Sequence, residues 1–176
     1  SQEDIVRMLE TIAPSFDKIS TYGMGYAGYY PPGTPWNQVD SNCRVARAAA
    51  LLNQRRGQRV IEVSQGIYQQ STPELQQAEI AAACTAAQEA NAVFPHTVTS
   101  LVFTNEYVTD TATTNAVTAM LTAHKPAVNA LGLKVGVRSQ TFGQLTNPAS
   151  PYLAPLQTLV RNCDFILCNL YPPNPP

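Results

Sequence analysis

The 176-residue chain has few charged residues and no excess of either sign. Only 13% of its residues are charged, and 11 Lys and Arg offset 12 Asp and Glu to a formal net charge of -1. Phosphate backbones and anionic lipids both need a basic surface, so this balance argues against nucleic acid and membrane surfaces as partners. No apolar run approaches the roughly 20 residues that a membrane-spanning helix requires. The first ten residues are acidic and amphipathic, unlike a signal peptide.

Cysteine and histidine are scarce as well. The four cysteines are Cys43, Cys84, Cys163 and Cys168. They are too few and too scattered for a disulfide framework, no CxxC pair indicates zinc, and their spacing leaves free thiols and one or two disulfides as equal alternatives. His96 and His124 have no partner at metal or triad spacing. We therefore expect no metal and no other cofactor.

The sequence does contain a regular alternation of helix and strand patterns, and 44% hydrophobic residues are typical of a folded chain. Expected helices cover residues 2–12, 40–56, 72–92, 111–131 and 151–160. Expected strands cover residues 18–22, 59–63, 100–104, 134–138 and 165–170. Strands that alternate with helices pair in parallel through right-handed crossovers. The sequence therefore predicts one α/β domain over residues 1–176, either a barrel or a doubly wound open sheet.

Two observations favour the barrel and a sugar ligand. No GxGxxG or GxxxxGK[ST] motif follows an expected strand, which argues against the open-sheet nucleotide folds. The loop after the first strand is instead rich in tyrosine, and aromatic rings with hydroxyl groups suit a sugar better than a pyrophosphate.

In a barrel, binding and chemistry gather at the carboxyl ends of the strands. Those ends carry Tyr22 after the first strand, Gln65 and Tyr68 after the second, Asn105 and Glu106 after the third, and Asn169 and Tyr171 after the fifth. Arg138, at the end of the fourth strand, has two equal interpretations: it binds a substrate hydroxyl or pairs with a neighbouring carboxylate. This distribution predicts a wet cleft that binds a carbohydrate.

The run Ser-Leu-Val-Phe-Thr-Asn-Glu at 100–106 resembles the strand of the family 17 glycoside hydrolases that ends in Gly-Asn-Glu, where the Glu is the catalytic acid/base. Four other segments resemble the family in the same order: 19–23, 60–68, 130–137 and 164–172, the last reading Asp-Phe-Ile-Leu-Cys-Asn-Leu-Tyr-Pro. Together they extend over nearly the whole chain. The resemblance implies an incomplete TIM-type (β/α) barrel of about five strands, equivalent to family strands 2 to 6.

The resemblance also implies an activity. The expected protein is a secreted or cell-wall hydrolase or transglycosylase that acts on β-1,3-glucan by a retaining mechanism, with Glu106 as the acid/base. A retaining enzyme needs a second carboxylate roughly 5 Å away as nucleophile. The residues expected to bind the glucan polysaccharide or oligosaccharide are Tyr22, Gln65, Tyr68, Asn105 and Tyr171.

Several departures from the family limit this interpretation. The family nucleophile belongs to the seventh strand, and no residue here matches it; Glu62 lies inside its strand and is not assigned the role. Thr104 replaces the family Gly, and Tyr68 replaces the Trp. An open arc of strands also has unpaired edges that invite further strands. Two alternatives follow: the central part of a longer enzyme, or a non-catalytic glucan-binding or extracellular assembly protein completed by a partner chain or a second copy.

Overall fold

The computed structural model describes residues 1–25 and 44–169. The helices are α1 (Gln2–Ile12), α2 (Val45–Arg56), α3 (Pro73–Val93), α4 (Thr111–Ala130) and α5 (Leu153–Asn162), with a 3-10 helix η3 (Thr141–Thr146). The strands are β1 (Lys18–Ser20), β2 (Glu62–Ile67), β3 (Val98–Asn105), β4 (Lys134–Ser139) and β5 (Phe165–Cys168). Tyr171, Cys43 and most of the tyrosine-rich loop lie outside the described residues.

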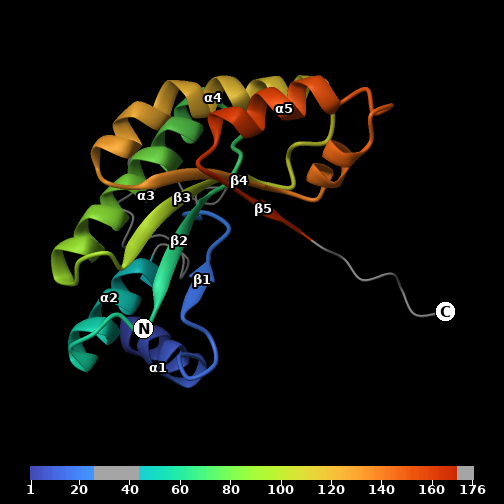
Figure 1. Ribbon diagram of the computed structural model, residues 1–176. Coiled ribbons are helices and arrows are strands. Elements are labelled where there is room, and N and C mark those ends of the chain that lie inside the picture. The colour runs from blue at the N-terminus through green and yellow to red at the C-terminus, as the bar shows by residue number, and fades with distance from the viewer. Residues whose placement is uncertain (26–43, 170–176) are drawn as a thin grey trace.

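The strands form one parallel sheet in the order β1-β2-β3-β4-β5. Figure 1 shows this sheet curling into an open arc, with the helices on its outer, convex side. The prediction of an α/β fold of the incomplete TIM-barrel type is therefore confirmed. In the part of the chain that the structure describes, no helix is long and apolar enough to cross a membrane.

The main difference from the expected elements is at β2, which begins at Glu62 and not at residue 59. The cause is Asn53, a fully buried residue near the end of α2. Its Oδ1 accepts hydrogen bonds from the backbone N–H of Val60 at 2.8 Å and of Ile61 at 3.0 Å, and its Nδ2 donates to the Ile61 carbonyl at 2.8 Å. These backbone groups are satisfied by a side chain, so strand pairing starts only after them.

The hydrophobic core lies between the convex face of the sheet and the helices. Residues that alternate along the strands are buried there, including Val63, Ile67, Leu101, Phe103, Val135 and Val137. The facing sides of α2 and α3 are rich in buried alanine, which lets the helices pack close to the sheet. The alternate positions along the strands, which on β2 are Glu62, Ser64 and Gly66, face the concave side.

Three cysteines, Cys84, Cys163 and Cys168, are free thiols in the described residues. Burial raises the pKa of the Cys163 thiol to about 11, with a smaller opposing effect of Lys125. Cys163 is therefore almost entirely protonated at neutral pH, unlike a reactive thiolate. With these three thiols free, the alternative of two disulfides is excluded. Cys43 lies outside the described residues.

Gly66 allows the chain after β1 to cross very close to β2. A Cβ at this position would lie 2.3 Å from the Thr21 carbonyl oxygen and 2.6 Å from the Tyr22 carbonyl carbon, both backbone atoms. Thr21 is held there because its Oγ1 accepts hydrogen bonds from the Gly66 N–H and from Gln65 Nε2, each at 2.8 Å. This contact fixes where Tyr22 leaves the sheet.

Gly66→Ala is expected to destabilise the protein by about 1–3 kcal/mol, because the new methyl group must displace backbone and not a flexible side chain. The matched control is Gly143→Ala, since a Cβ at Gly143 meets nothing within 4 Å. Urea unfolding of the two variants measures the difference. Equal stability of both variants would contradict the close crossing at Gly66.

Candidate active site

The carboxyl end of β3 has a strained backbone. Thr104 has a φ of 60° and Glu106 a φ of 56°. This left-handed region is uncommon for residues other than glycine, and a β-branched residue such as Thr is an outlier there. The pairing with β4 also shifts register between Phe103 and Asn105. Strain of this kind persists only where surrounding contacts impose it, and it concentrates at functional sites.

Glu106 joins the ends of three strands. Its backbone N–H donates to the carbonyl of Arg138, at the end of β4, at 3.1 Å. Its Oε1 accepts a hydrogen bond from Nδ2 of Asn169, just after β5, at 2.7 Å. The carboxylate is therefore oriented by a residue 63 positions away in the sequence. The predicted acid/base is thus held at the mouth of the arc where the strands end.

Asn105 lies next to this carboxylate and is anchored through its backbone. Its N–H donates to Oε1 of Gln69, in the loop after β2, at 3.3 Å. Its side-chain Oδ1 is buried and has no hydrogen-bond partner among the described residues. A buried acceptor without a partner costs free energy, so a ligand donor at this atom would be favoured.

Arg138 has a role that the sequence left open. Arg138 is buried, with only 6% of its surface exposed. Nη1 donates to the Thr21 carbonyl at 3.2 Å, Nη2 donates to Ser20 Oγ, and the guanidinium carbon lies 4.9 Å from the centre of the Tyr22 ring. Burial lowers the pKa of Arg138, while the charges of Tyr22 and Glu106 oppose that shift. Arg138 therefore links β4 to the end of β1 across the concave face.

The other predicted sugar-binding residues have different environments. Tyr22 is 58% exposed and lies against Arg138, so its second ring face is open to a ligand. Tyr68 is half-buried directly after β2. Gln65 is fully buried, on the same side of β2 as Val63 and Ile67, and it supports Thr21 through a hydrogen bond. It therefore has no direct access to the concave face. Tyr171 lies outside the described residues.

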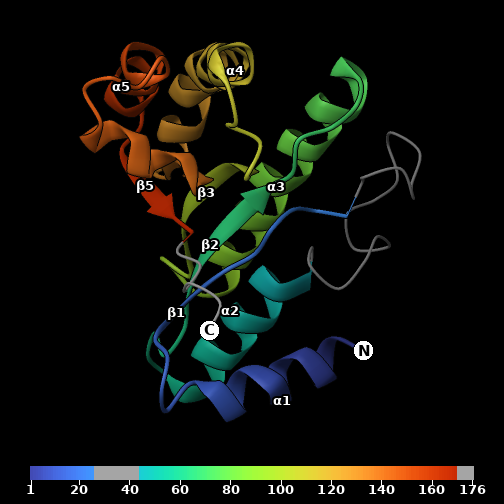
Figure 2. The same cartoon turned by 90° about the vertical axis from the view of Figure 1, so that its right-hand side faces the viewer.

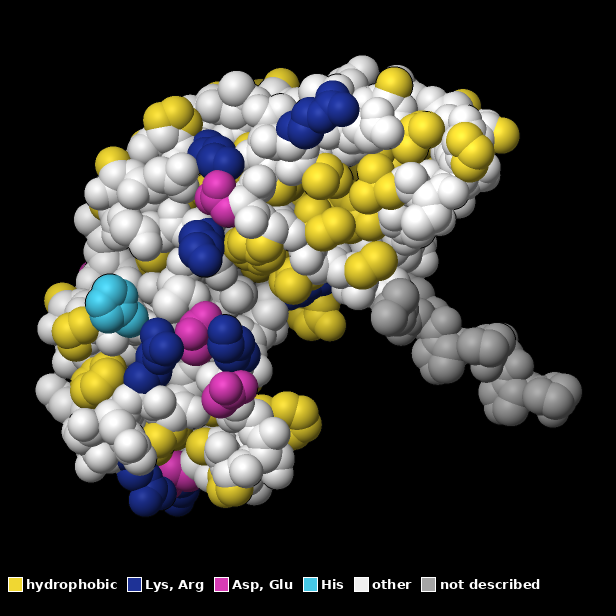
Figure 3. Space-filling model, in the orientation of Figure 1, with side chains coloured by type: hydrophobic (Ala, Val, Ile, Leu, Met, Phe, Trp, Pro, Cys, Tyr) yellow, Lys and Arg dark blue, Asp and Glu magenta, His cyan; other side chains and the backbone are white. Residues whose placement is uncertain are grey.

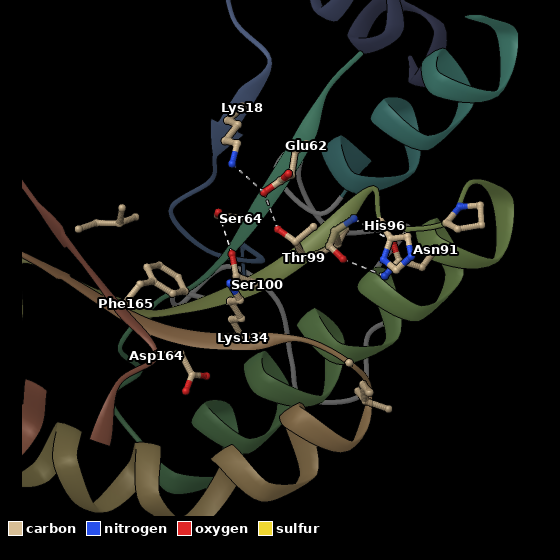
Figure 4. Close-up of a pocket in the computed structure, with 15 residues that line it drawn as sticks. Lys18, Glu62, Ser64, Asn91, His96, Thr99, Ser100, Lys134, Asp164 and Phe165 are labelled. Carbon is tan, nitrogen blue, oxygen red and sulfur yellow. Dashed lines mark hydrogen bonds and ion pairs between the residues drawn. The ribbon is translucent and has the colours of Figure 1, made fainter. Parts of the chain in front are cut away.

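Glu62 lies at the other end of the sheet. It is the first residue of β2, where it pairs with Lys18 and Arg59 at 3.5 Å and accepts a hydrogen bond from Thr99 at 2.8 Å. Figure 4 shows Lys18, Glu62 and Thr99 among the residues that line a cavity of about 710 Å³. The cavity is lined by the first residues of all five strands, so it opens at their amino ends. In barrels that end of the sheet contributes to stability, and chemistry belongs to the carboxyl ends.

Two further properties of the surface bear on ligand class. In the face seen in Figure 3, Lys and Arg lie next to Asp and Glu instead of forming a patch of one sign. Within residues 1–25 and 44–169 there is no group of three or more His, Cys, Asp or Glu side chains that could hold a metal ion. The face seen in Figure 3 therefore has no patch of one sign that would select a charged ligand.

Comparison with known proteins identifies the fold. No protein-family model and no curated protein matches the sequence. A solved structure, an endo-laminarinase from Formosa Hel1_33_131, is similar with a TM-score of 0.67 and 15% sequence identity. The match covers 94% of this chain and 44% of the laminarinase. The chain therefore has the fold of rather less than half of that endo-laminarinase.

Thr104→Gly is expected to stabilise the protein by about 1 kcal/mol. Relief of a left-handed conformation contributes about 1–3 kcal/mol, and the backbone entropy of glycine removes about 0.5–1 kcal/mol of this. The change also removes a buried hydroxyl that has no partner in the described residues. Thr104→Ser, which keeps the Cβ and the hydroxyl, serves as the control in urea unfolding. A glycine variant less stable than the serine variant would refute the strained backbone.

Arg138→Lys is expected to destabilise the protein by about 1–2 kcal/mol, because one ammonium group cannot reproduce the planar contacts to Ser20, Thr21 and Tyr22. The control is Arg161→Lys, at an exposed position in the last turn of α5. Thermal unfolding should separate the two variants. If both unfold at the wild-type temperature, the link between β4 and β1 contributes nothing to the arc.

Proposed function

We propose that this chain supplies the acid/base part of a retaining glycosidase site that acts on β-1,3-glucan. The observation that supports it most directly is Glu106 itself, which follows a barrel strand at its carboxyl end and accepts a 2.7 Å hydrogen bond from Asn169. A half-buried carboxylate fixed at this place in the fold is suited to proton transfer. The fold likeness to an endo-laminarinase is consistent with the same class of substrate.

In this proposal Glu106 protonates the glycosidic oxygen as the bond to the sugar breaks. A second carboxylate, supplied from outside these 176 residues and roughly 5 Å from Glu106, attacks the anomeric carbon to form a glycosyl-enzyme. Glu106 then takes a proton from the water, or from the acceptor sugar, that releases the product. Transfer to a sugar makes the protein a transglycosylase, and transfer to water makes it a hydrolase.

The glucan contacts follow from the same geometry. Asn105 hydrogen-bonds the sugar hydroxyl beside the reacting carbon, where a contact that strengthens in the transition state accelerates the reaction. The exposed ring of Tyr22 stacks on a sugar, with Tyr68 and Tyr171 as further contacts. Gln65 contributes indirectly by holding Thr21, which precedes Tyr22. We place this activity outside the cell or in the cell wall.

A second candidate is favoured by the edges of the sheet. Among the described residues, β1 and β5 each pair with a strand on one side only. An unpaired edge is a template for another strand. A non-catalytic glucan-binding or assembly protein would use these edges to bind a partner chain or a second copy, and Glu106 would then have no chemical role.

Replacement of Glu106 by Gln in the natural, full-length protein tests the first candidate. Release of reducing ends from laminarin should fall by about 10²–10⁴-fold, the usual contribution of general acid/base catalysis. With an aryl β-glucoside whose leaving group needs no proton, the variant should still give a burst of released aryl alcohol. Added azide should restore its turnover by replacing the activated water. The control is Glu74→Gln, at an exposed position in the first turn of α3.

The same assays distinguish the alternative. Wild-type protein that binds laminarin without hydrolysing it, with binding unchanged in Glu106→Gln, would support the non-catalytic protein. An active wild type whose rate is unaffected by the substitution would remove Glu106 from the mechanism.

A further inference from the structure

Glu79, in the second turn of α3, is a buried carboxylate with unusual contacts. Glu79 lies on α3 and is fully buried, on a helix face otherwise made of Ile80 and alanines. Charged side chains are almost never fully buried unless they are paired or hydrogen-bonded. Its partners therefore indicate why a carboxylate occupies this position.

Glu79 binds the backbones of two loops at once. Its Oε1 accepts a hydrogen bond from the Met24 N–H, after β1, at 2.5 Å, and another from the Tyr68 N–H, after β2, at 3.0 Å. Its Oε2 accepts from the Gln70 side-chain amide at 3.2 Å. Figure 2 shows the chain after β1 running alongside β2 towards α3. One carboxylate thus joins the exits of two neighbouring strands.

The approach of the two loops is close enough to require a glycine. A Cβ at Gly23 would lie 2.7 Å from the Cβ of Tyr68 and 2.8 Å from Oε1 of Glu79. Both loops are therefore in direct contact at the carboxylate, so a shift in one must move the other.

From these loops the contacts continue to the candidate acid. The residue after Tyr68 is Gln69, whose Oε1 accepts the Asn105 N–H at 3.3 Å, and Asn105 precedes Glu106. On the other side, Met24 is two residues from Tyr22, whose ring lies against Arg138. Glu79 is thereby connected to both sides of the site without touching the reacting atoms.

We infer that Glu79 is a positioning residue: it fixes the loops at Met24 and at 68–70, and through Gln69 it sets the position of Asn105 and Glu106. The catalytic consequence rests on the proposed function, whereas the anchoring of the loops does not. A misplacement of about 1 Å in a catalytic group can cost about 100-fold in rate, so an anchor of this kind is consequential.

The test compares Glu79→Ala with Glu79→Gln in the full-length protein. Amide hydrogen exchange should speed up by about tenfold or more at Met24 and Tyr68 in the alanine variant, because both amides lose their acceptor. Exchange at Asn105 should also speed up, while exchange at Leu101 inside β3 should not. Glutamine keeps an oxygen for both amides, so it should restore protection to within about threefold of wild type. Glu74→Ala is the control on the same helix.

Kinetics on laminarin provide the second measurement. Glu79→Ala should lower kcat by about 10–100-fold with KM changed less than about threefold, and glutamine should restore most of the rate. Equal acceleration of exchange at Leu101 and Tyr68, or full protection of Met24 and Tyr68 in the alanine variant, would overturn the inference. A third outcome separates the two proposals. If the wild type does not hydrolyse laminarin, but Met24 and Tyr68 are protected in it and lose protection in Glu79→Ala, the anchor is supported and the proposed function is refuted.

Glu79→Asp keeps the test decisive if the alanine variant does not fold. Aspartate retains the charge but is one methylene shorter, so it should leave at least one of the two amides, Met24 or Tyr68, exchanging faster than in wild type. Wild-type exchange at both amides in the aspartate variant would overturn the proposed anchor.

Discussion

The curvature of the sheet and the contact of Arg138 with β1 depend on each other. β1 and β4 are separated by β2 and β3, and three strand spacings in a flat sheet amount to roughly 14 Å, too far for one side chain to span. The observed hydrogen bond to the Thr21 carbonyl therefore requires a curled sheet. Gly66 contributes by leaving room for the chain after β1. The same contact holds the Tyr22 ring against Arg138, so the candidate binding surface is a consequence of the curl.

Periodicity was sufficient to predict the elements but not every place where pairing begins. The range of α1 was predicted correctly because Ser1 caps the helix and its apolar spacing is regular. The predicted start of β2 was wrong because the Val60 and Ile61 N–H groups donate to the side chain of Asn53. Strand propensity takes no account of such a contact with a neighbouring helix. A similar arrangement recurs where α3 meets β3, since Asn91 accepts the Val98 N–H and donates to its carbonyl. Helix-borne asparagines thus set the entry to two neighbouring strands.

In the candidate site, too, some residues could be predicted from the sequence and others could not. The place of Asn105 and Glu106 at the carboxyl end of β3 was predictable from position along the chain. Gln65 was expected after the second strand, but β2 continues to Ile67, so Gln65 lies inside the strand and beneath Thr21 instead of in the cleft. Glu79 could not be found from pattern, because a Glu within a helix is ordinarily a solvated residue. Its function is visible only when two loops distant in sequence are seen to share its oxygen atoms.

The strain at the end of β3 explains why so many polar contacts converge there. Left-handed conformations at Thr104 and Glu106 cost of order 1–3 kcal/mol each, and β3 alone gives no reason to adopt them. The contacts that impose them come from different elements: Arg138 accepts the Glu106 N–H, Gln69 accepts the Asn105 N–H, and Asn169 holds the carboxylate. Since Gln69 belongs to the loop that Glu79 anchors, loss of that anchor should allow the end of β3 to relax towards a regular strand. A relaxed strand would turn Glu106 away from Asn169, which makes the buried carboxylate on α3 a determinant of where the candidate acid points.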